Sequence, residues 1–209
     1  MGSGVIQPTV LIVPGLRCHV AQHWQALLQG RLERQGRKVR SVPPMGRVDL
    51  ECATRLAAIE RQVRLIDGPL VVVAHSGGCV MLAHWAWKSK RRILGALLAT
   101  PPDFETAMPD GYPRLSDLQA GGWLPVPRQR LPFPSIVAAS RNDPLGRYEQ
   151  VAALARDWGS QLVDLGEVGH LNPASGFGTW DRAEEFINQI ADTAMPARRA
   201  TSTLAPSLK

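Results

Sequence analysis

One stretch decides the fold: Leu70-Val71-Val72-Val73-Ala74-His75-Ser76-Gly77-Gly78. An apolar, β-branched run leads straight into small residues around a serine, and a helical pattern follows. This order predicts a strand, a tight turn and a helix, with the Ser76 hydroxyl exposed above the strand end as a nucleophile. The usual signature of such a turn is G-x-S-x-G. Here Ala74 stands at the position of the first glycine, so the match is one methyl group away from the pattern.

The rest of the chain alternates apolar runs with amphipathic stretches. Short apolar runs bounded by turn residues predict strands at residues 9–13, 38–42, 70–74, 93–99, 135–139 and 161–165. Helical spacing of apolar residues predicts helices at residues 22–35, 50–66, 77–87, 148–158 and 180–194. This alternation predicts an α/β fold in three layers, with a mostly parallel central sheet that carries helices on both faces.

The composition fits one globular domain. The chain has 209 residues, of which 44% are hydrophobic and 20% are charged, and this suits a single domain with a substantial core. We expect the domain to span residues 1–195, and the small and polar residues 196–209 to form a disordered tail. No apolar run approaches the ~20 residues that span a bilayer. The N-terminus also lacks the pattern of a secretory signal.

Cysteine usage and charge bear on location and partners. Cys18, Cys52 and Cys79 are odd in number and lack metal-ligand spacing, so we expect reduced thiols, a cytoplasmic location and no metal site. The net charge of +6 raises the question of nucleic-acid binding. However, the basic residues cluster at residues 31–40 and 88–92, near the predicted ends of helices, where they complement the helix dipole. We therefore expect neither a nucleic-acid partner nor a membrane contact.

Three chemically functional residues each follow a predicted strand. Ser76 follows the third strand, Asp143 the fifth and His170 the sixth. Because the carboxyl ends of parallel strands meet at one edge of a sheet, these side chains should lie close together. A serine hydroxyl needs an adjacent base to act as a nucleophile, an imidazole can take and return the proton, and a carboxylate can orient the imidazole. We predict that Ser76 is the nucleophile, His170 the general base and acid, and Asp143 the orienting acid.

Two other acidic residues are alternatives to Asp143. Asp164 lies within the last predicted strand, and Glu167 is close to His170 in the sequence. Asp143 is favoured because it follows a strand and precedes a proline that stiffens the turn. The sequence Asn-Asp-Pro is also good turn chemistry, so a purely structural role for Asp143 stays open.

The other histidines are less suited to act as the base. His75 is held beside Ser76 in a poor direction for accepting its proton, and His84 falls within a predicted helix. His19 and His23 lie near the first loop, on the same edge of the sheet as the predicted site. These two histidines are therefore candidates for lining a substrate pocket.

Two backbone N–H groups are candidates for stabilising an oxyanion. The N–H of Gly77 lies at the start of a predicted helix, where the helix dipole favours negative charge. The second should come from the loop after the first strand, Pro14-Gly15-Leu16, where the N–H of Leu16 is the candidate. The alternative is that Pro14-Gly15 is an ordinary turn.

These motifs together resemble the RBBP9/YdeN-like serine hydrolases, a family of the α/β-hydrolase superfamily. The resemblance extends over almost the whole predicted domain and rests on Val13-Pro14-Gly15-Leu16 followed by His23-Trp24-Gln25, on Ala74-His75-Ser76-Gly77-Gly78-Cys79, on Asn142-Asp143-Pro144, and on Gly169-His170-Leu171-Asn172 with Ser175-Gly176-Phe177-Gly178-Thr179-Trp180. The chain departs from the family at Gly77, where the family often has leucine. The resemblance implies a compact hydrolase without a large cap domain, which acts on small ester or related acyl substrates. It also supports Ser76, Asp143 and His170 as the catalytic residues, with an acyl-enzyme intermediate and no cofactor.

Residues 100–134, rich in proline and glycine, should form a wall over this site. The candidate pocket residues are His23, Trp24, His75 and Trp123, although Trp24 fits a core-facing helix position equally well. Because this connection is too short for a full helical cap, we predict a modest acyl pocket that prefers short chains. The alternative function is a catalytically weak scaffold that serves as a protein-interaction module, since a fold alone does not establish an activity.

Overall fold

A six-stranded parallel sheet runs through the centre of the molecule, in the order β2-β1-β3-β4-β5-β6. The computed structural model describes residues 7–16, 20–46 and 50–194. Its strands are β1 (Thr9–Val13), β2 (Val39–Ser41), β3 (Leu70–His75), β4 (Gly95–Ala99), β5 (Ser135–Ala139) and β6 (Gln161–Asp164). Because β2 lies on one side of β1 and β3 on the other, the strand order reverses between β1 and β3. Open parallel sheets bind ligands in the crevice at such a switch point.

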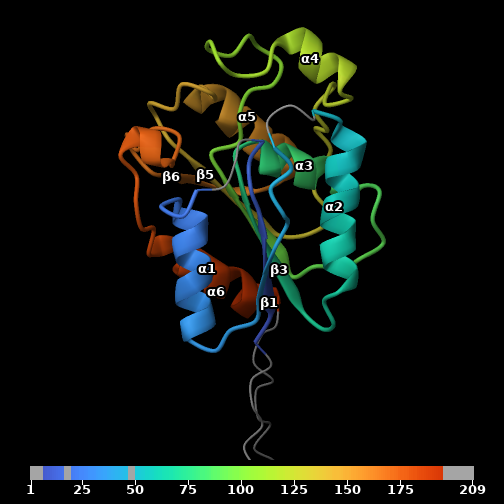
Figure 1. Cartoon of the computed structure of the whole chain (residues 1–209), viewed down its shortest axis with the longest axis vertical. Coiled ribbons are helices and arrows are strands. Elements are labelled where there is room, and N and C mark those ends of the chain that lie inside the picture. The colour runs from blue at the N-terminus through green and yellow to red at the C-terminus, as the bar shows by residue number, and fades with distance from the viewer. Residues whose placement is uncertain (1–6, 17–19, 47–49, 195–209) are drawn as a thin grey trace, which may run out of the picture.

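Helices cover both faces of the sheet (Figure 1). The helices are α1 (Trp24–Arg34), α2 (Cys52–Arg64), α3 (Gly77–Ala86), α4 (Leu115–Ala120), α5 (Tyr148–Trp158) and α6 (Arg182–Ala194), with a 3₁₀ turn η1 at Pro173–Ser175. Helices α1 and α6 pack on one face, whereas α2, α3 and α5 pack on the other. The predicted three-layer α/β fold is confirmed.

Alternate side chains of each strand belong to two separate hydrophobic clusters. In β1, Leu11 and Val13 pack towards α2 and α3, whereas Val10 and Ile12 pack towards α1 and α6. All four side chains are buried, which is why this strand reads as a continuous apolar run in the sequence. Both faces of the sheet are therefore occupied by core packing, and polar chemistry is confined to the strand ends.

The predicted elements agree closely with the structure. The bounds of β1, β5 and α5 are as predicted, and the other predicted elements differ by one or two residues at an end. Helix α4 was not predicted, because it is short and buries only Leu118. Of the remaining expectations, Cys18 and the tail at residues 196–209 lie outside the described residues.

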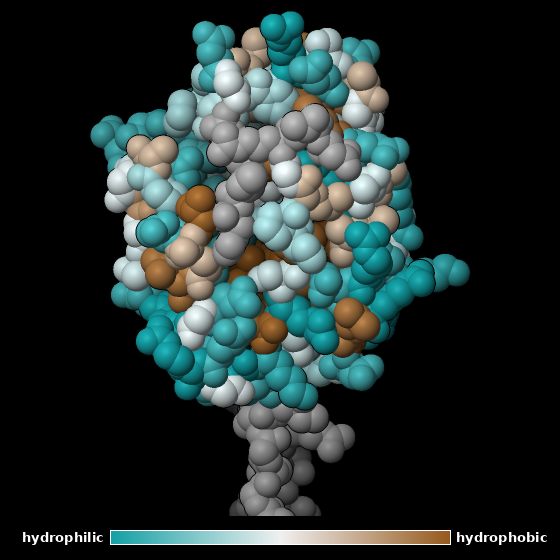
Figure 2. Space-filling model, in the orientation of Figure 1, coloured by the Kyte–Doolittle hydropathy of each residue, from teal (hydrophilic) through white to brown (hydrophobic). Residues whose placement is uncertain are grey.

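Polar side chains cover most of the face shown in Figure 2, with small apolar patches between them. Part of the basic surface is paired within the fold, since Arg31 at the end of α1 forms ion pairs with Asp181 and Glu184. Arg91, in the second basic cluster, donates to the main-chain carbonyl groups of Ile66 and Gly68, which follow α2. None of the helices in the described part of the chain is long and apolar enough to cross a membrane.

Candidate active site

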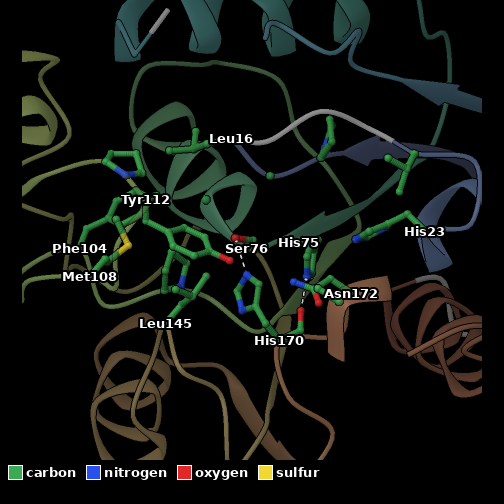
Figure 3. Close-up of a pocket in the computed structure, with 18 of the residues that line it drawn as sticks. Leu16, His23, His75, Ser76, Phe104, Met108, Tyr112, Leu145, His170 and Asn172 are labelled. Atoms are coloured by element: carbon green, nitrogen blue, oxygen red, sulfur yellow. Dashed lines mark hydrogen bonds between the residues drawn. The ribbon is translucent and has the colours of Figure 1, made fainter. Parts of the chain in front are cut away.

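Ser76 and His170 meet at the carboxyl edge of the sheet (Figure 3), and Asp143 lies on the far side of the imidazole. The hydroxyl Oγ of Ser76 lies 2.8 Å from Nε2 of His170. On the other side of the ring, Nδ1 of His170 lies 2.8 Å and 3.0 Å from the two carboxylate oxygens of Asp143. Because a carboxylate can only accept, Nδ1 carries the hydrogen and Nε2 is free to accept the hydrogen of Ser76. The structure thus brings together the three residues that the sequence predicted.

The burial of these three side chains suits the arrangement. His170 is 4% exposed and Asp143 is 7% exposed, whereas Ser76 is only partly buried. The hydroxyl group therefore faces a cavity, and the imidazole and the carboxylate lie behind it in a site that water reaches poorly. Electrostatic interactions and hydrogen bonds are stronger in such surroundings than in bulk water.

The backbone of Ser76 is strained in the way that a tight strand-to-helix turn requires. Its φ is 54° and its ψ is −133°, a conformation that residues with a side chain rarely adopt. The turn is held on both sides, because the N–H of Ser76 donates to the carbonyl of Ala99 and the N–H of Cys79 donates to the carbonyl of Ser76. Ser76 directly precedes α3, so its hydroxyl stands at the N-terminal end of that helix.

Two glycines allow the first loop and the serine turn to approach each other. A Cβ at Gly15 would lie 3.0 Å from the Cβ of Ser76. A Cβ at Gly78 would lie 2.6 Å from the carbonyl oxygens of both Val13 and Pro14. The last glycine of the signature is therefore required by the close contact between α3 and the end of β1.

The loops that carry Asp143 and His170 are joined by hydrogen bonds. Asn142 accepts the N–H of Gly169 at 2.7 Å through its side-chain oxygen, and Ser140 accepts the N–H of Val168 at 3.2 Å. Asp143 also accepts the N–H of Leu145 at 2.9 Å. Sequence reasoning did not assign roles to Ser140 and Asn142, although both belong to the polar run after β5 that contains Asp143. These bonds hold the carboxylate at a fixed distance from the imidazole.

The two alternative acids do not contact His170. Asp164 pairs with Arg141, which donates to it from Nε at 2.8 Å, and it also accepts the N–H of Gly166. The hydrogen bond from Arg141 lowers the pKa of Asp164. Glu167 is exposed, and no hydrogen bond or ion pair joins it to His170 among the described residues. Of the three candidate acids, Asp143 alone contacts the imidazole of His170.

The remaining histidines have separate surroundings. His84 lies in α3 and its Nε2 donates to the carbonyl of Trp123 at 3.1 Å. His23 precedes α1, where its Nδ1 accepts the N–H of Gln25 at 3.2 Å and so caps the helix. His75 is buried, and its ring lies between those of His23 and His170. His19 lies outside the described residues.

The two residues predicted to supply oxyanion donors, Leu16 and Gly77, are neighbours beside Ser76. A Cβ at Gly77 would lie 2.6 Å from Cγ of Leu16 and 3.3 Å from Cζ of Phe104. The space that a leucine would need at residue 77 is thus filled here by Leu16 and Phe104. Both Leu16 and Gly77 line the same cavity as Ser76.

The cavity at Ser76 has a volume of about 460 Å³ and two unlike walls. The labelled side chains in Figure 3 fall on either side of Ser76. The largely apolar wall consists of Leu16, Phe104, Met108, Tyr112 and Leu145. The polar wall consists of His23, His75 and Asn172. A cavity of this size and mixture suits a small organic ligand.

Two of the predicted pocket residues are not part of this cavity. Trp24 is fully buried in the core, where its ring meets that of Trp180 edge to face at a centroid distance of 4.8 Å. Trp123 is also fully buried, and its indole N–H donates to the carbonyl of Leu50 at 2.7 Å. Both predictions were wrong, because proximity in the sequence to the site does not fix the direction of a large side chain. His23 and His75, the other two candidates, do line the cavity.

Sequence reasoning assigned no role to Gln25, which lies near the site. Gln25 is fully buried and donates from its amide to the carbonyl groups of Val13 in β1 and Val73 in β3, both at 3.2 Å. It therefore joins the two strands at the switch point. Its position in the quoted His-Trp-Gln motif was the only signal available in the sequence. Within the described residues, no group of three or more His, Cys, Asp or Glu side chains is arranged to hold a metal ion.

The chain matches one protein family and is similar in fold to several solved structures. The family model described as serine hydrolase matches residues 10–189. The chain is similar to the solved structure of a YdeN-like hydrolase from Pectobacterium atrosepticum, with 25% identity, a TM-score of 0.76, and coverage of 91% of this chain and 94% of that one. It is also similar in fold to the ydeN gene product of B. subtilis, with 16% identity, a TM-score of 0.71, and coverage of 89% and 100%. Est1E from Butyrivibrio proteoclasticus is also similar in fold, with 14% identity, a TM-score of 0.63, and coverage of 90% of this chain and 87% of that one. Comparison with curated protein sequences gave no match.

Proposed function

Because this chain belongs to the serine hydrolase family, we propose that it hydrolyses small ester or related acyl substrates through a triad of Ser76, His170 and Asp143. The observation that carries this proposal is the unbroken series of hydrogen bonds from Oγ of Ser76 through the imidazole of His170 to the carboxylate of Asp143, each between 2.8 and 3.0 Å long. Together with the strained turn at Ser76, this arrangement supports nucleophilic acyl transfer.

In the first half of the reaction, Oγ of Ser76 attacks the acyl carbon and its proton passes to Nε2 of His170. Asp143 holds the Nδ1–H of the imidazole and stabilises the imidazolium that forms. The negative charge on the former carbonyl oxygen is stabilised by the N–H groups of Gly77 and Leu16. His170 then returns the proton to the leaving alcohol, which departs and leaves an acyl group on Ser76. A water molecule then gives a proton to His170 and attacks this ester. The proton returns from His170 to Oγ of Ser76 as the acid is released.

The two walls of the cavity support a substrate with an apolar acyl group and a more polar remainder. The apolar wall, formed in part by Phe104 and Met108, can bury a short acyl chain. Each buried CH₂ group would stabilise the bound substrate by roughly 0.8 kcal/mol. We propose that esters with short acyl chains are preferred, because the connection over the site contains only one short helix, α4, rather than a cap domain. Much faster cleavage of long-chain p-nitrophenyl esters than of the acetyl and butyryl esters would contradict this preference.

An active-site fluorophosphonate probe tests the proposed nucleophile. The protein should be labelled at Ser76, and Ser76→Ala should neither be labelled nor hydrolyse p-nitrophenyl acetate. Loss of Ser76 or His170 should lower kcat on the order of 10⁶-fold, as triad deletions do in subtilisin. Absence of labelling in the folded wild-type protein would instead favour the protein-interaction module, the alternative function for this scaffold. Because a structure of Est1E holds ferulic acid, the substrate panel should include an aromatic acyl ester as well.

A further inference from the structure

We propose that His75 is a positioning residue, whose Nε2–H holds the main-chain carbonyl of His170 and so fixes the base against Ser76. This inference rests on the proposed function, since it concerns how the triad of that reaction is held. Nε2 of His75 lies 2.9 Å from the carbonyl oxygen of His170. A carbonyl oxygen can only accept, so the hydrogen of the His75 ring resides on Nε2.

The position of His75 in the chain makes this bond a link between two catalytic loops. His75 is the last residue of β3 and directly precedes the nucleophile Ser76. The sheet fixes its backbone, because His75 pairs with Ala99 of β4. The bond therefore connects a rigid strand end to the loop that carries the imidazole, 95 residues further along the chain.

The loop around His170 requires such a support. Leu171, the next residue, has a φ of 48°, which is unfavourable for a residue with a branched side chain. The peptide group between these two residues is thus held in a strained orientation, and its carbonyl oxygen is the atom that His75 binds. On the other side, the N–H of His170 donates to Oγ of Ser175 at 3.0 Å. Release of the carbonyl would allow this peptide to turn and would move the attached imidazole.

The charge state of His75 is also suited to this role. The titratable groups that face its ring are His23, at a centroid distance of 4.7 Å, and His170, at 5.0 Å (Figure 3). The ring of Trp24 also meets that of His75 edge to face at 5.9 Å. Burial and then these two histidines lower the pKa of His75 well below its ordinary value. A neutral His75 avoids placing a second positive charge beside the imidazolium that forms on His170 during the reaction. It also keeps one hydrogen on Nε2 without competing for the proton of Ser76.

The matched variants His75→Gln and His75→Asn test this inference. Both side chains are neutral amides, but only glutamine is long enough to place its N–H near the position of Nε2. We expect His75→Asn to lower kcat by about 100-fold, the loss that a misplacement of about 1 Å can cause, with KM little changed. His75→Gln should restore most of kcat, and the rate of fluorophosphonate labelling should follow the same order. His84→Asn, which removes a comparable histidine–carbonyl bond away from Ser76, should keep the wild-type kcat.

Several results would overturn the inference. Equal kcat in His75→Asn and His75→Gln, or an effect confined to KM, would show that the bond to His170 does not position the base. Nitrogen NMR of the wild-type protein gives an independent test that does not depend on the folding of a variant. A neutral ring with its hydrogen on Nε2 supports the inference, whereas a hydrogen on Nδ1 refutes it. Ser76→Ala tests the proposed function separately. Turnover that survives Ser76→Ala would refute the proposed function, whereas an inactive Ser76→Ala with equal kcat in the two His75 variants would refute the inference alone.

Discussion

Lowering the pH from about 7.5 to about 5.5 should destabilise the folded protein through His75, and His75→Gln should remove that part of the loss. His75 is only 5% exposed, and burial is the largest cause of its lowered pKa. In the unfolded chain, a histidine titrates near about pH 6.5. Below that pH the unfolded state therefore binds a proton that the folded state excludes. The stability associated with neutral His75 is present above about pH 6.5 and is lost as the pH falls towards the folded pKa.

The size of this loss follows from proton linkage. If the folded pKa lies well below the lower pH, the unfolded state alone gains protons over the interval. The loss of unfolding free energy is then about RT ln 10, or about 1.4 kcal/mol, between one pH unit above and one pH unit below the unfolded pKa. This amount is large enough to measure, because small proteins are stable by only about 5–15 kcal/mol in total.

Urea unfolding at both pH values measures this loss for the wild-type protein and for His75→Gln. The wild type should lose up to about 1.4 kcal/mol more than the variant over the interval. His84→Gln is the matched control, because burial also lowers the pKa of His84 but this ring is less deeply buried. Its effect should have the same sign and a smaller size. If the wild type and His75→Gln lost the same stability, His75 would have to be protonated in the folded state, and the reasoning would be refuted.

Three further predictions concern the packing around the site. Gly78→Ala should lower the free energy of unfolding by about 1–3 kcal/mol, because the new methyl group overpacks against the end of β1. Gly30→Ala, with open space around it, should raise the free energy of unfolding by about 0.5–1 kcal/mol in the same urea assay. Trp123→Phe should lower the free energy of unfolding by about 0.5–1.5 kcal/mol by removing the indole hydrogen bond to the carbonyl of Leu50, and kcat for p-nitrophenyl acetate should stay close to the wild-type value; a large loss of kcat without loss of stability would contradict its core position. Burial raises the pKa of Cys52 to about 11 and that of Cys79 well above its ordinary value, so at about pH 8 neither thiol should react with iodoacetamide until the protein unfolds, as mass spectrometry can show.

The strands and the grouping of the site residues could be predicted from the sequence, because they depend on residue types in short segments and on the order of those segments along the chain. After Thr9, the run at β1 is entirely apolar and stops at Pro14-Gly15, so both its type and its end are visible in the sequence. The placing of Ser76, Asp143 and His170 near one another followed from a general property of parallel sheets, that the carboxyl ends of their strands share one edge. No contact between these residues had to be known in advance.

The remaining features depend on contacts between distant segments. The bond from Asn142 to Gly169 and that from His75 to His170 join different loops, and neither is indicated by local spacing. Trp123 illustrates the same limit, because it lies in the wall-forming connection but its indole is fully buried and donates to the carbonyl of Leu50 instead of lining the cavity. Sequence position therefore predicted which loops meet, while the direction of individual side chains was set by packing.

The first and last positions of the G-x-S-x-G signature, Ala74 and Gly78, have different surroundings. Ala74 lies within β3, where its methyl group is fully buried and packs in the hydrophobic cluster under α2 and α3, so a side chain is accommodated there. At Gly78 the corresponding methyl group would meet two carbonyl oxygens of the chain that leads from β1 into Pro14-Gly15-Leu16. The separation of α3 from the end of β1 also sets the distance between the N–H groups of Gly77 and Leu16, the proposed oxyanion donors. A methyl group at residue 78 would thus widen the oxyanion site itself, whereas a methyl group at residue 74 only fills the core.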